Sequence, residues 1–389
     1  MEENKKAIIS RRAFIAGSGA VLFTALLGGC KAETLTSTVT STKTSTLLST
    51  ITDVLTTTET VTVTETALQP ATRVITDMAG NQVTVPYDIK RIVITCYGGA
   101  THEVAAMGAA AKIVAQPNMN TFPAFLKMYP EFSDIPFVGS FSDVNIEELL
   151  ELNPDVVIAS MTSTQMNQEI AEVGIPVISI YTSMYNVATD LENEFSMMGS
   201  LLNSTERSDE LNNFWNQQLQ VIEEHLQDIA VEDRKKVYYS IGPLTRTTGN
   251  TLWGQALITA AGGINVGESL EGTLNIDAEQ IIEWNPDVVI IRRGSGTGLV
   301  EISDFTDNPQ LQGIKAVKNN QVYGCPIGTF WWDCPAPEMI LGIVWLAKTL
   351  YPEQMSDVDL EALTKSFYSQ FYDYELTTEE FEAFLSQDS

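Results

Sequence analysis

The chain has 389 residues, a length that suggests two or three domains. Its 22 Lys and Arg residues are outnumbered by 50 Asp and Glu residues, and the formal net charge of −28 excludes a protein whose main task is to neutralise nucleic-acid phosphates. Only two histidines occur, so one chain cannot build a three-histidine zinc site. Beyond residue 30 no apolar run reaches the ~18 residues that a membrane-spanning helix needs.

Residues 1–29 have the pattern of an export signal that is removed from the mature protein. Residues 10–15 (SRRAFI) are typical of a twin-arginine signal, and an apolar stretch follows at 20–27. The next residues, LGGC, are typical of a lipobox, in which the new N-terminal cysteine, Cys30, is acylated. We therefore expect an exported protein that is lipid-anchored to the outer face of the cytoplasmic membrane, in the periplasm or at the cell surface. A short core helix with a buried cysteine is the alternative.

The segment from residue 30 to residue 70 is predicted to be a disordered tether. Of the 33 residues at 34–66, 20 are Ser or Thr, a composition that buries too little apolar area to offset the ordering of the chain. The alternation TVTVT at 60–64 is typical of a strand, so β structure stays open as an alternative here.

After Pro70 short β-branched runs alternate with helix-length amphipathic segments, which predicts an α/β fold with mostly parallel sheets. The helices are expected between most of the strands. The predicted strands cover 91–95, 112–115, 155–160, 176–180, 236–241, 287–292 and 321–325.

An internal repeat predicts two similar lobes. Residues 146–160 align with residues 278–292, and eight of the fifteen aligned positions are identical. Each copy begins with a helix N-cap signature and continues through Asn-Pro into a buried Asp-Val-Val-Ile strand. Between the copies, apolar residues recur every three or four positions from 211 to 226, which predicts one long connecting helix. The expected domains are an N-terminal lobe at 71–204, a connecting helix at 205–230 and a C-terminal lobe with terminal helices at 231–389.

These features together resemble one protein family. The lipobox, the Ser/Thr tether, residues 75–81 (ITDMAGN), residues 85–86 (VP), residues 91–93 (RIV) and the two NPDVV units are similar to substrate-binding lipoproteins of ABC importers for ferric siderophores, cobalamin and haem. The resemblance covers about Thr72 to the C-terminus. It implies two Rossmann-like α/β lobes joined by one long α-helix, with a ligand cleft between the lobes. It also implies a monomer whose partners are a small metal chelate and an ABC permease dimer with its ATPase.

Two acidic residues are candidates for docking onto the permease. Glu147 and Glu279 occupy the same place in the two repeats, in the first turn of a helix. An acidic residue there also interacts favourably with the helix dipole and needs no partner, which is the simpler interpretation of each one alone. In the family that the chain resembles, one such glutamate in each lobe meets arginines of the permease. The matched positions favour docking onto a twofold dimer, which salt would weaken.

Ligand-binding candidates follow from the expectation that ligands lie beyond the carboxyl ends of parallel strands. The candidates include arginines and aromatic residues, and a pocket lined by both would suit an anionic, partly flat ligand. Arg293 alternates with Arg292, and one of the two is expected to point away from the cleft. Of the adjacent tryptophans in the last loop, we expect one in the core and one exposed. Phe141 is a candidate through the resemblance alone, because cobalamin-binding relatives carry an aromatic contact there. The candidates are Tyr97, Phe141, Arg246, Trp253, Arg292, Arg293, Trp331 and Trp332.

The remaining reactive residue types are few. His102 is more often a hydrogen-bonded residue than a metal ligand in such a setting, and His225 is expected on a solvated helix face. A disulfide between Cys325 and Cys334 is one alternative in an oxidising compartment, and free thiols are the other. We predict neither a metal site nor catalytic residues.

The predicted function is that of a non-enzymatic, substrate-binding lipoprotein of an ABC importer. A ferric siderophore is the first candidate ligand, and cobalamin or another corrinoid, haem and molybdate are the alternatives; none is a catalytic cofactor. An exported enzyme is the rival from another class, but GxSxG, HExxH and phosphate-loop motifs are all absent from the sequence. The last rival is an inert lipoprotein displayed on a Ser/Thr stalk.

Overall fold

The structure is a computed structural model that describes residues 35–43, 57–65, 71–97, 99–181, 187–294 and 300–386. The chain divides into two compact units, residues 1–70 and residues 71–389. The expected signal peptide and Cys30 lie outside the described residues. No described helix is long and apolar enough to cross a membrane.

The described part of the first unit is a pair of antiparallel strands. Strands β1 (Leu35–Lys43) and β2 (Thr57–Glu65) pair in a continuous register that places Leu35 opposite Glu65. This differs from the disordered tether that composition predicts. The alternation of Thr with Val at 60–64 is the pattern that favours a strand, and a second segment of similar composition provides its partner.

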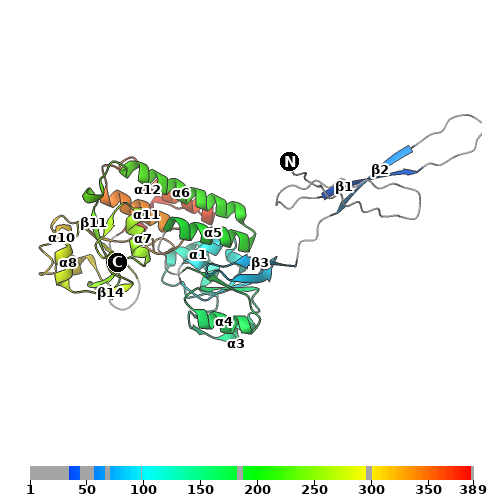
Figure 1. The fold of residues 1–389 in the computed structure, drawn as a ribbon, viewed down its shortest axis with the longest axis horizontal. Helices are drawn as coiled ribbons and strands as arrows, with labels where there is room; N and C mark the ends of the chain where they lie inside the picture. The colour runs from blue at the N-terminus through cyan, green and yellow to red at the C-terminus, as the bar shows by residue number, and fades with distance from the viewer. Residues whose placement is uncertain are drawn as a thin grey trace, which may run out of the picture. The chain divides into compact units, whose positions relative to one another are not determined.

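In the second unit, the first lobe is built on a parallel sheet with its helices around it (Figure 1). The strand order is β10 (Val177–Ile180), β9 (Val156–Ser160), β5 (Ile92–Ile94) and β6 (Ile113–Ala115). Two antiparallel hairpins pair β3 (Thr72–Thr76) with β4 (Gln82–Pro86) and β7 (Gly139–Ser140) with β8 (Asp143–Val144). The helices are α1 (Ala100–Ala106), α2 (Pro123–Met128), α3 (Ile146–Glu151), α4 (Thr164–Glu172) and α5 (Val187–Leu202).

The second lobe has a mixed sheet with a parallel centre. The strand order is β14 (Thr273–Asn275), β12 (Arg246–Thr248), β11 (Lys236–Ser240), β15 (Val288–Ile291) and β16 (Val322–Gly324), and β13 (Ile264–Asn265) also pairs with β11. Strands β12 and β14 are antiparallel to their neighbours. The helices are α7 (Trp253–Ala260), α8 (Ala278–Trp284), α9 (Ile302–Thr306), α10 (Lys315–Lys318), α11 (Met339–Leu350), α12 (Leu360–Tyr372) and α13 (Thr378–Leu385). Each strand predicted from the β-branched runs is present, so the α/β expectation is confirmed.

Helix α6 (Thr205–Leu226) joins the lobes, as the apolar spacing predicts. Leu211, Trp215, Ile222 and Leu226 are buried along one face. The indole Nε1 of Trp215 donates a hydrogen bond to the carbonyl oxygen of Pro337 at 3.0 Å. Helix α6 therefore packs against the rest of the molecule and is not an exposed linker between the lobes.

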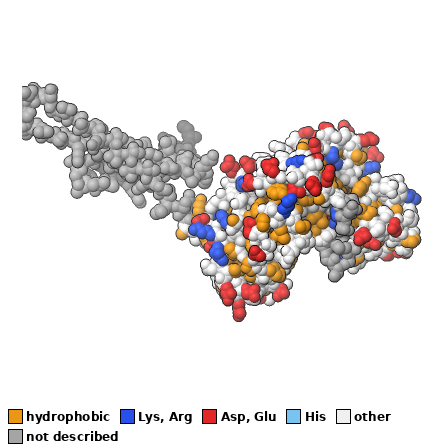
Figure 2. Space-filling model, turned by 180° about the vertical axis from the view of Figure 1, so that it is seen from behind, with side chains coloured by type: hydrophobic (Ala, Val, Ile, Leu, Met, Phe, Trp, Pro, Cys, Tyr) orange, Lys and Arg blue, Asp and Glu red, His pale blue; other side chains and the backbone are white. Residues whose placement is uncertain are grey.

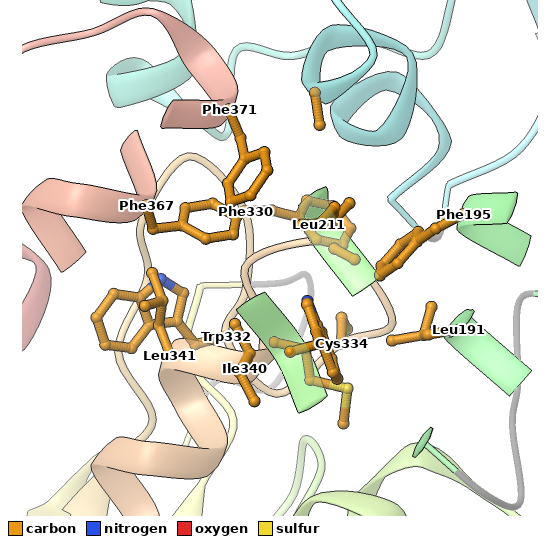
Figure 3. Packing of buried hydrophobic residues seen from close by; sticks show 14 of the residues in the cluster. Leu191, Phe195, Leu211, Phe330, Trp332, Cys334, Ile340, Leu341, Phe367 and Phe371 are labelled. Atoms are coloured by element: carbon orange, nitrogen blue, oxygen red, sulfur yellow. The ribbon is translucent and has the colours of Figure 1, made fainter. Parts of the chain in front are cut away.

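The two sheets share one hydrophobic core. Successive residues of a strand point to opposite faces. In β9 and β15, Ile158 and Ile290 lie in the larger cluster, whereas Val157 and Val289 lie in clusters of their own lobes. The larger cluster includes residues of both sheets and of the helices between them. Figure 3 shows part of it, where Trp332 lies near Leu341 of α11.

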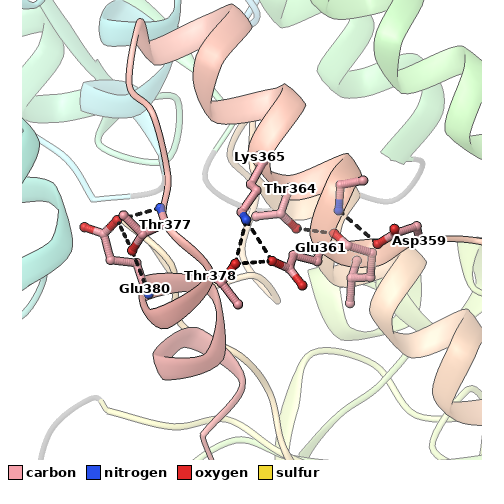
Figure 4. A network of polar contacts seen from close by, with 9 residues as sticks. Asp359, Glu361, Thr364, Lys365, Thr377, Thr378 and Glu380 are labelled. Atoms are coloured by element: carbon pink, nitrogen blue, oxygen red, sulfur yellow. Dashed lines mark hydrogen bonds and ion pairs between the residues drawn. The ribbon is translucent and has the colours of Figure 1, made fainter.

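The C-terminal helices α12 and α13 are tied together by polar contacts (Figure 4). Lys365 Nζ donates to Glu361 Oε1 and to Thr378 Oγ1, each at 2.8 Å. Thr377 and Glu380 form a capping box at the start of α13. Lys127 of α2 pairs with Glu380 at 2.5 Å, so the C-terminal segment also contacts the first lobe.

The two copies of the internal repeat have equivalent structures. Asp155, before β9, accepts a hydrogen bond on Oδ2 from the backbone N–H of Arg91 at 2.9 Å. Asp287, before β15, accepts one from the N–H of Lys236, also at 2.9 Å. In both lobes the aspartate of the NPD unit thus holds the start of the adjacent strand, which explains why that unit recurs.

Candidate functional site

A pocket of about 140 Å³ lies between the two lobes. The first lobe contributes residues that follow β5 and connect β7 to β8, and the second lobe contributes residues that follow β15 and β16 or begin α7. The pocket therefore lies at carboxyl ends of parallel strands, where ligands are expected. Its lining residues are Tyr97, Phe141, Trp253, Arg292, Phe330, Trp331, Cys334 and Pro335.

The wall from the first lobe is aromatic. Tyr97 and Phe141 stack with ring centroids 6.3 Å apart and an interplanar angle of 28°. Phe141 has a φ of 55°, a left-handed backbone conformation that non-glycine residues rarely adopt. Its N–H donates to the carbonyl oxygen of Thr95 at 2.7 Å, which fixes the turn beside the end of β5. Strained backbone of this kind is frequent at ligand sites.

The wall from the second lobe places a cation between two indoles. The guanidinium carbon of Arg292 lies 5.4 Å from the ring centroid of Trp253 and 4.6 Å from that of Trp331. Both distances are within the range of cation–π attraction. Flat aromatic faces hold the side chain of Arg292 in one orientation without using its N–H donors.

Two buried donors at this wall have no acceptor among the residues that the structure describes. They are Arg292 Nε and Trp331 Nε1, and both residues line the pocket. A buried N–H without a hydrogen bond costs about 1–3 kcal/mol, more for a charged group. An occupant whose negatively charged oxygen atoms reached these donors would remove this cost.

A buried polar network lies behind Arg292. Trp253 Nε1 donates to Tyr239 Oη at 3.3 Å, and Tyr239 Oη donates to Asp333 Oδ2 at 2.6 Å. Burial by itself lowers the pKa of Arg292, but Cys334, Asp333 and Tyr239 raise it above its ordinary value. Because burial raises the pKa of Cys334 to about 12, its thiol is neutral at physiological pH. Asp333, which accepts the hydrogen bond of Tyr239, is one of the groups that favour the charged form of Arg292.

The loop that carries Trp331 is anchored on Glu338. This carboxyl group is fully buried and accepts hydrogen bonds from Thr329 N, Trp332 Nε1 and Tyr368 Oη at 2.9–3.1 Å. Burial raises the pKa of Glu338 to about 7, while these donors act to lower it. The anchor holds the loop from its core side and leaves Trp331 on the pocket side.

The structure brings five of the eight predicted ligand contacts into the pocket, and three lie elsewhere. Trp332 is fully buried in the core, so of the two adjacent tryptophans only Trp331 lines the pocket. Arg293 is half-buried and its Nη1 donates to the carbonyl oxygen of Ser386. Arg246 is exposed at the start of β12 and does not line the pocket.

Several residues of the site escape prediction from the sequence. Phe330, Cys334 and Pro335 line the pocket, and Asp333 and Glu338 support it from behind. One signal for Glu338 is present in the sequence: it is the only charged residue from 334 to 347. A single carboxyl group in such an apolar run must be buried or functional.

The histidine at the cleft is a structural residue. His102 is buried, with its ring centroid 4.8 Å from that of Phe125 and 4.7 Å from that of Phe330. Its Nε2 lies 2.9 Å from the carbonyl oxygen of Thr329, which can only accept, so Nε2 carries the hydrogen. Burial lowers the pKa of His102 to about 4, so the ring is neutral at physiological pH.

Other candidate chemistry is sparse in the described part of the chain. Cys96, Cys325 and Cys334 are free buried thiols, so the alternative disulfide is not formed in the structure. No group of three or more His, Cys, Asp or Glu side chains within residues 71–97, 99–181, 187–294 and 300–386 is arranged to hold a metal ion.

Two buried glutamates near the cleft make stability depend on pH. Burial raises the pKa of Glu103 to about 7 and the pKa of Glu194 well above its usual value, and the charge of Glu103 adds to the second shift. Glu194 Oε2 accepts a hydrogen bond from Tyr181 N at 2.6 Å. The folded protein therefore binds these protons more tightly than the unfolded chain does.

A pH series should reveal this linkage. Because the folded-state pKa is the higher one, stability is greatest below the unfolded value of 4.5 and falls as the pH rises through about 7. We expect Glu103→Gln to raise the melting temperature at pH 8 and to leave it nearly unchanged at pH 5. Exposed Glu148→Gln is the control. Equal shifts at both pH values would contradict the prediction.

The predicted docking residues lie on equivalent surfaces. Glu147 and Glu279 are both exposed, in the first turns of α3 and α8. Asn145 Oδ1 accepts a hydrogen bond from Glu147 N at 3.1 Å, and Asp277 Oδ1 accepts one from Gln280 N at 2.8 Å. The N-cap residues therefore stabilise both helices, and the glutamate side chains are free for solvent or a partner.

Comparisons with known proteins agree on one class. A family model described as periplasmic binding protein matches residues 93–327. The molybdate-binding protein MolA of Haemophilus influenzae is 27% identical over 326 residues, which cover 78% of this chain and 91% of that protein.

Solved structures show the same fold. The structure of MolA bound to molybdate has a TM-score of 0.70 at 26% identity and covers 78% of this chain and 99% of that one. A periplasmic solute binding protein from Veillonella parvula has a TM-score of 0.70 at 27% identity, covering 81% of this chain and 97% of that chain.

Proposed function

Because the chain belongs to the periplasmic binding protein family, we propose that it is the substrate-binding protein of an ABC importer, and that its solute is a tetrahedral metal oxyanion such as molybdate. The family is exported and its members bind solutes without transforming them, which agrees with a non-enzymatic role. The finer part of the proposal, the oxyanion, is argued from the pocket.

One observation carries the choice of solute. Arg292 Nε and Trp331 Nε1 are buried donors without an acceptor in the described part of the chain, and both residues line one pocket. An oxyanion supplies oxygen acceptors and a negative charge next to the guanidinium of Arg292. The name of the relative from Haemophilus influenzae, a molybdate-binding protein, supports the same solute class.

A ferric siderophore, the first candidate from the sequence, is the second candidate here. The stacked rings of Tyr97 and Phe141 and the indole of Trp331 suit a flat chelate. The volume of about 140 Å³ favours the smaller solute, since pockets for drug-sized ligands measure about 300–1,000 Å³. Corrinoids and haem also exceed this volume and are the remaining candidates.

A binding panel tests the function. We expect molybdate and tungstate to change the tryptophan fluorescence of the purified protein and to raise its melting temperature, by about 2.7 kcal/mol of stabilisation at a hundredfold excess over Kd. Sulfate tests whether any dianion suffices, and a ferric catecholate, cyanocobalamin and haem complete the panel. Binding of a ferric chelate alone would replace the oxyanion by the second candidate. No response to any solute would support the inert display lipoprotein instead.

We further propose that Cys30 is acylated after twin-arginine export and anchors the protein outside the cytoplasmic membrane. The SRRAFI and LGGC motifs support this proposal. Cell fractionation checks it: the natural chain should sediment with membranes, and Cys30→Ala should not reach the mature, membrane-bound form. Membrane-bound Cys30→Ala at its normal level would contradict the anchor.

The permease is proposed to meet the protein through Glu147 and Glu279. Their exposure and their equivalent places in the two lobes support contact with two equivalent basic sites of a twofold dimer. Exposed charges of this kind mainly set the rate and orientation of encounter.

A further inference from the structure

Helices α3 and α8 present the same pattern of acidic and apolar side chains to solvent. In each helix an exposed glutamate is followed three residues later by an exposed large apolar residue and four residues later by a second exposed glutamate. Residues three and four apart lie on one helix face. We call this surface the docking face; it consists of Glu147, Leu150 and Glu151 on α3 and Glu279, Ile282 and Glu283 on α8.

The apolar members of the docking face are unusually exposed for their type. The exposed fraction is 47% for Leu150 and 41% for Ile282. Their neighbours Leu149 and Ile281 are completely buried, so both helices already have an apolar side that packs on their own lobe. Leu150 and Ile282 therefore leave a large part of their apolar surface in water.

A single exposed leucine needs no explanation, but a matched pair does. Leu150 and Ile282 occupy the same position of the repeat, where the side chain differs and the apolar character does not. Helices α3 and α8 belong to different lobes; in Figure 1, α3 lies at the bottom of the first lobe, away from α6, and α8 lies at the outer edge of the second lobe, beside α10. Figure 2 shows acidic side chains gathered at the end of the first lobe that carries α3 and α4.

We infer that Leu150 and Ile282 are apolar anchors that insert beside the glutamates into two equivalent sites of the permease dimer. This inference rests on the proposed function. The occupant is a twofold-symmetric membrane partner whose two sites each combine a basic side chain with an apolar depression. The glutamates of the docking face imply the basic side chain in each partner site, because opposite charges attract. The exposed Leu150 and Ile282 imply the apolar depression in each partner site.

The two kinds of contact have different salt dependence. Attraction between exposed charges weakens as salt increases, whereas burial of apolar surface does not. Glu147→Gln and Glu279→Gln should therefore weaken binding and flatten its salt dependence. Leu150→Ser and Ile282→Ser should weaken binding about tenfold each at every salt concentration and leave the salt dependence as it was. The sites are far apart, so the double variant should lose the product of the two factors.

The measurement uses the full-length protein and the permease–ATPase complex of the same importer in lipid nanodiscs, with Kd determined at low and high salt. Matched controls are Val74→Ser and Val231→Ser, because these valines are 58% and 65% exposed and lie outside the docking face. Calorimetry with molybdate on each variant checks that the pocket is intact.

The outcomes separate the inference from the function on which it rests. Unchanged affinity of Leu150→Ser and Ile282→Ser, with a loss in the glutamine variants, would overturn the apolar anchors and leave acidic docking. Unchanged affinity of all four variants would overturn the docking face while the importer function stands. If the unmodified protein binds a solute but never the permease complex, the proposed function itself fails.

Discussion

Replacement of Arg292 by glutamine should weaken molybdate binding by about 30-fold to several-thousand-fold. Loss of one partner of a buried charge pair costs about 2–5 kcal/mol, and each 1.4 kcal/mol is a factor of ten. Arg292 would face the oxyanion in the pocket, between the rings of Trp253 and Trp331. Glutamine keeps an N–H donor but removes the charge and the stacking.

Two variants make this result specific. Arg292→Lys keeps the charge and loses the planar Nε donor, so an intermediate affinity is expected. Arg293→Gln is the matched control, because its guanidinium is directed to the carbonyl oxygen of Ser386 and does not line the pocket. Titration calorimetry with sodium molybdate provides the affinities. Equal losses in Arg292→Gln and Arg293→Gln would show that the site has been misassigned.

The adjacent tryptophans should respond to substitution in opposite ways. Trp332→Ala removes a fully buried side chain and takes a hydrogen bond from Glu338, so a loss of about 3–5 kcal/mol in unfolding free energy is expected. Trp331→Ala should change stability much less, because its indole lies at the pocket and its Nε1 has no acceptor among the described residues. The same variant should bind molybdate markedly less well.

Urea denaturation and calorimetry on both variants decide this prediction. If Trp332→Ala does not fold, Trp332→Phe keeps most of the volume and still removes the Nε1 donor to Glu338, so a smaller loss of stability remains measurable. Weaker binding in Trp332→Phe together with unchanged binding in Trp331→Ala would reverse the assignment of the two residues.

Patterns along the chain predict the fold well. The seven β-branched runs become strands, the repeat at 146–160 and 278–292 becomes a helix and strand in each lobe, and the apolar spacing from 211 to 226 becomes α6. These features depend on local sequence and on which face of each element is buried. The pairing of β1 with β2 was the exception, because a Ser/Thr-rich composition says little about whether a partner strand is at hand.

The pocket was harder to predict because its details depend on distant parts of the chain. Strand alternation places Arg292 and Arg293 on opposite sides, but Ser386, near the C-terminus, is what engages Arg293. Likewise the choice between Trp331 and Trp332 follows from Glu338, which holds only one of them. Neither partner can be identified from the sequence around the residue itself.

The shared core constrains how the protein gives up its cargo. Both sheets and α6 contribute to one continuous cluster, and Lys127 on α2 contacts Glu380 on α13. Separation of the two lobes would expose that cluster to water, at a free-energy cost of about 2.5 kcal/mol for every 100 Å² of apolar surface. Thermal fluctuation therefore favours small movements at the entrance of the pocket. Wide separation of the lobes would need an external source of free energy. We expect the ATP-driven transporter to supply that free energy by pulling on α3 and α8.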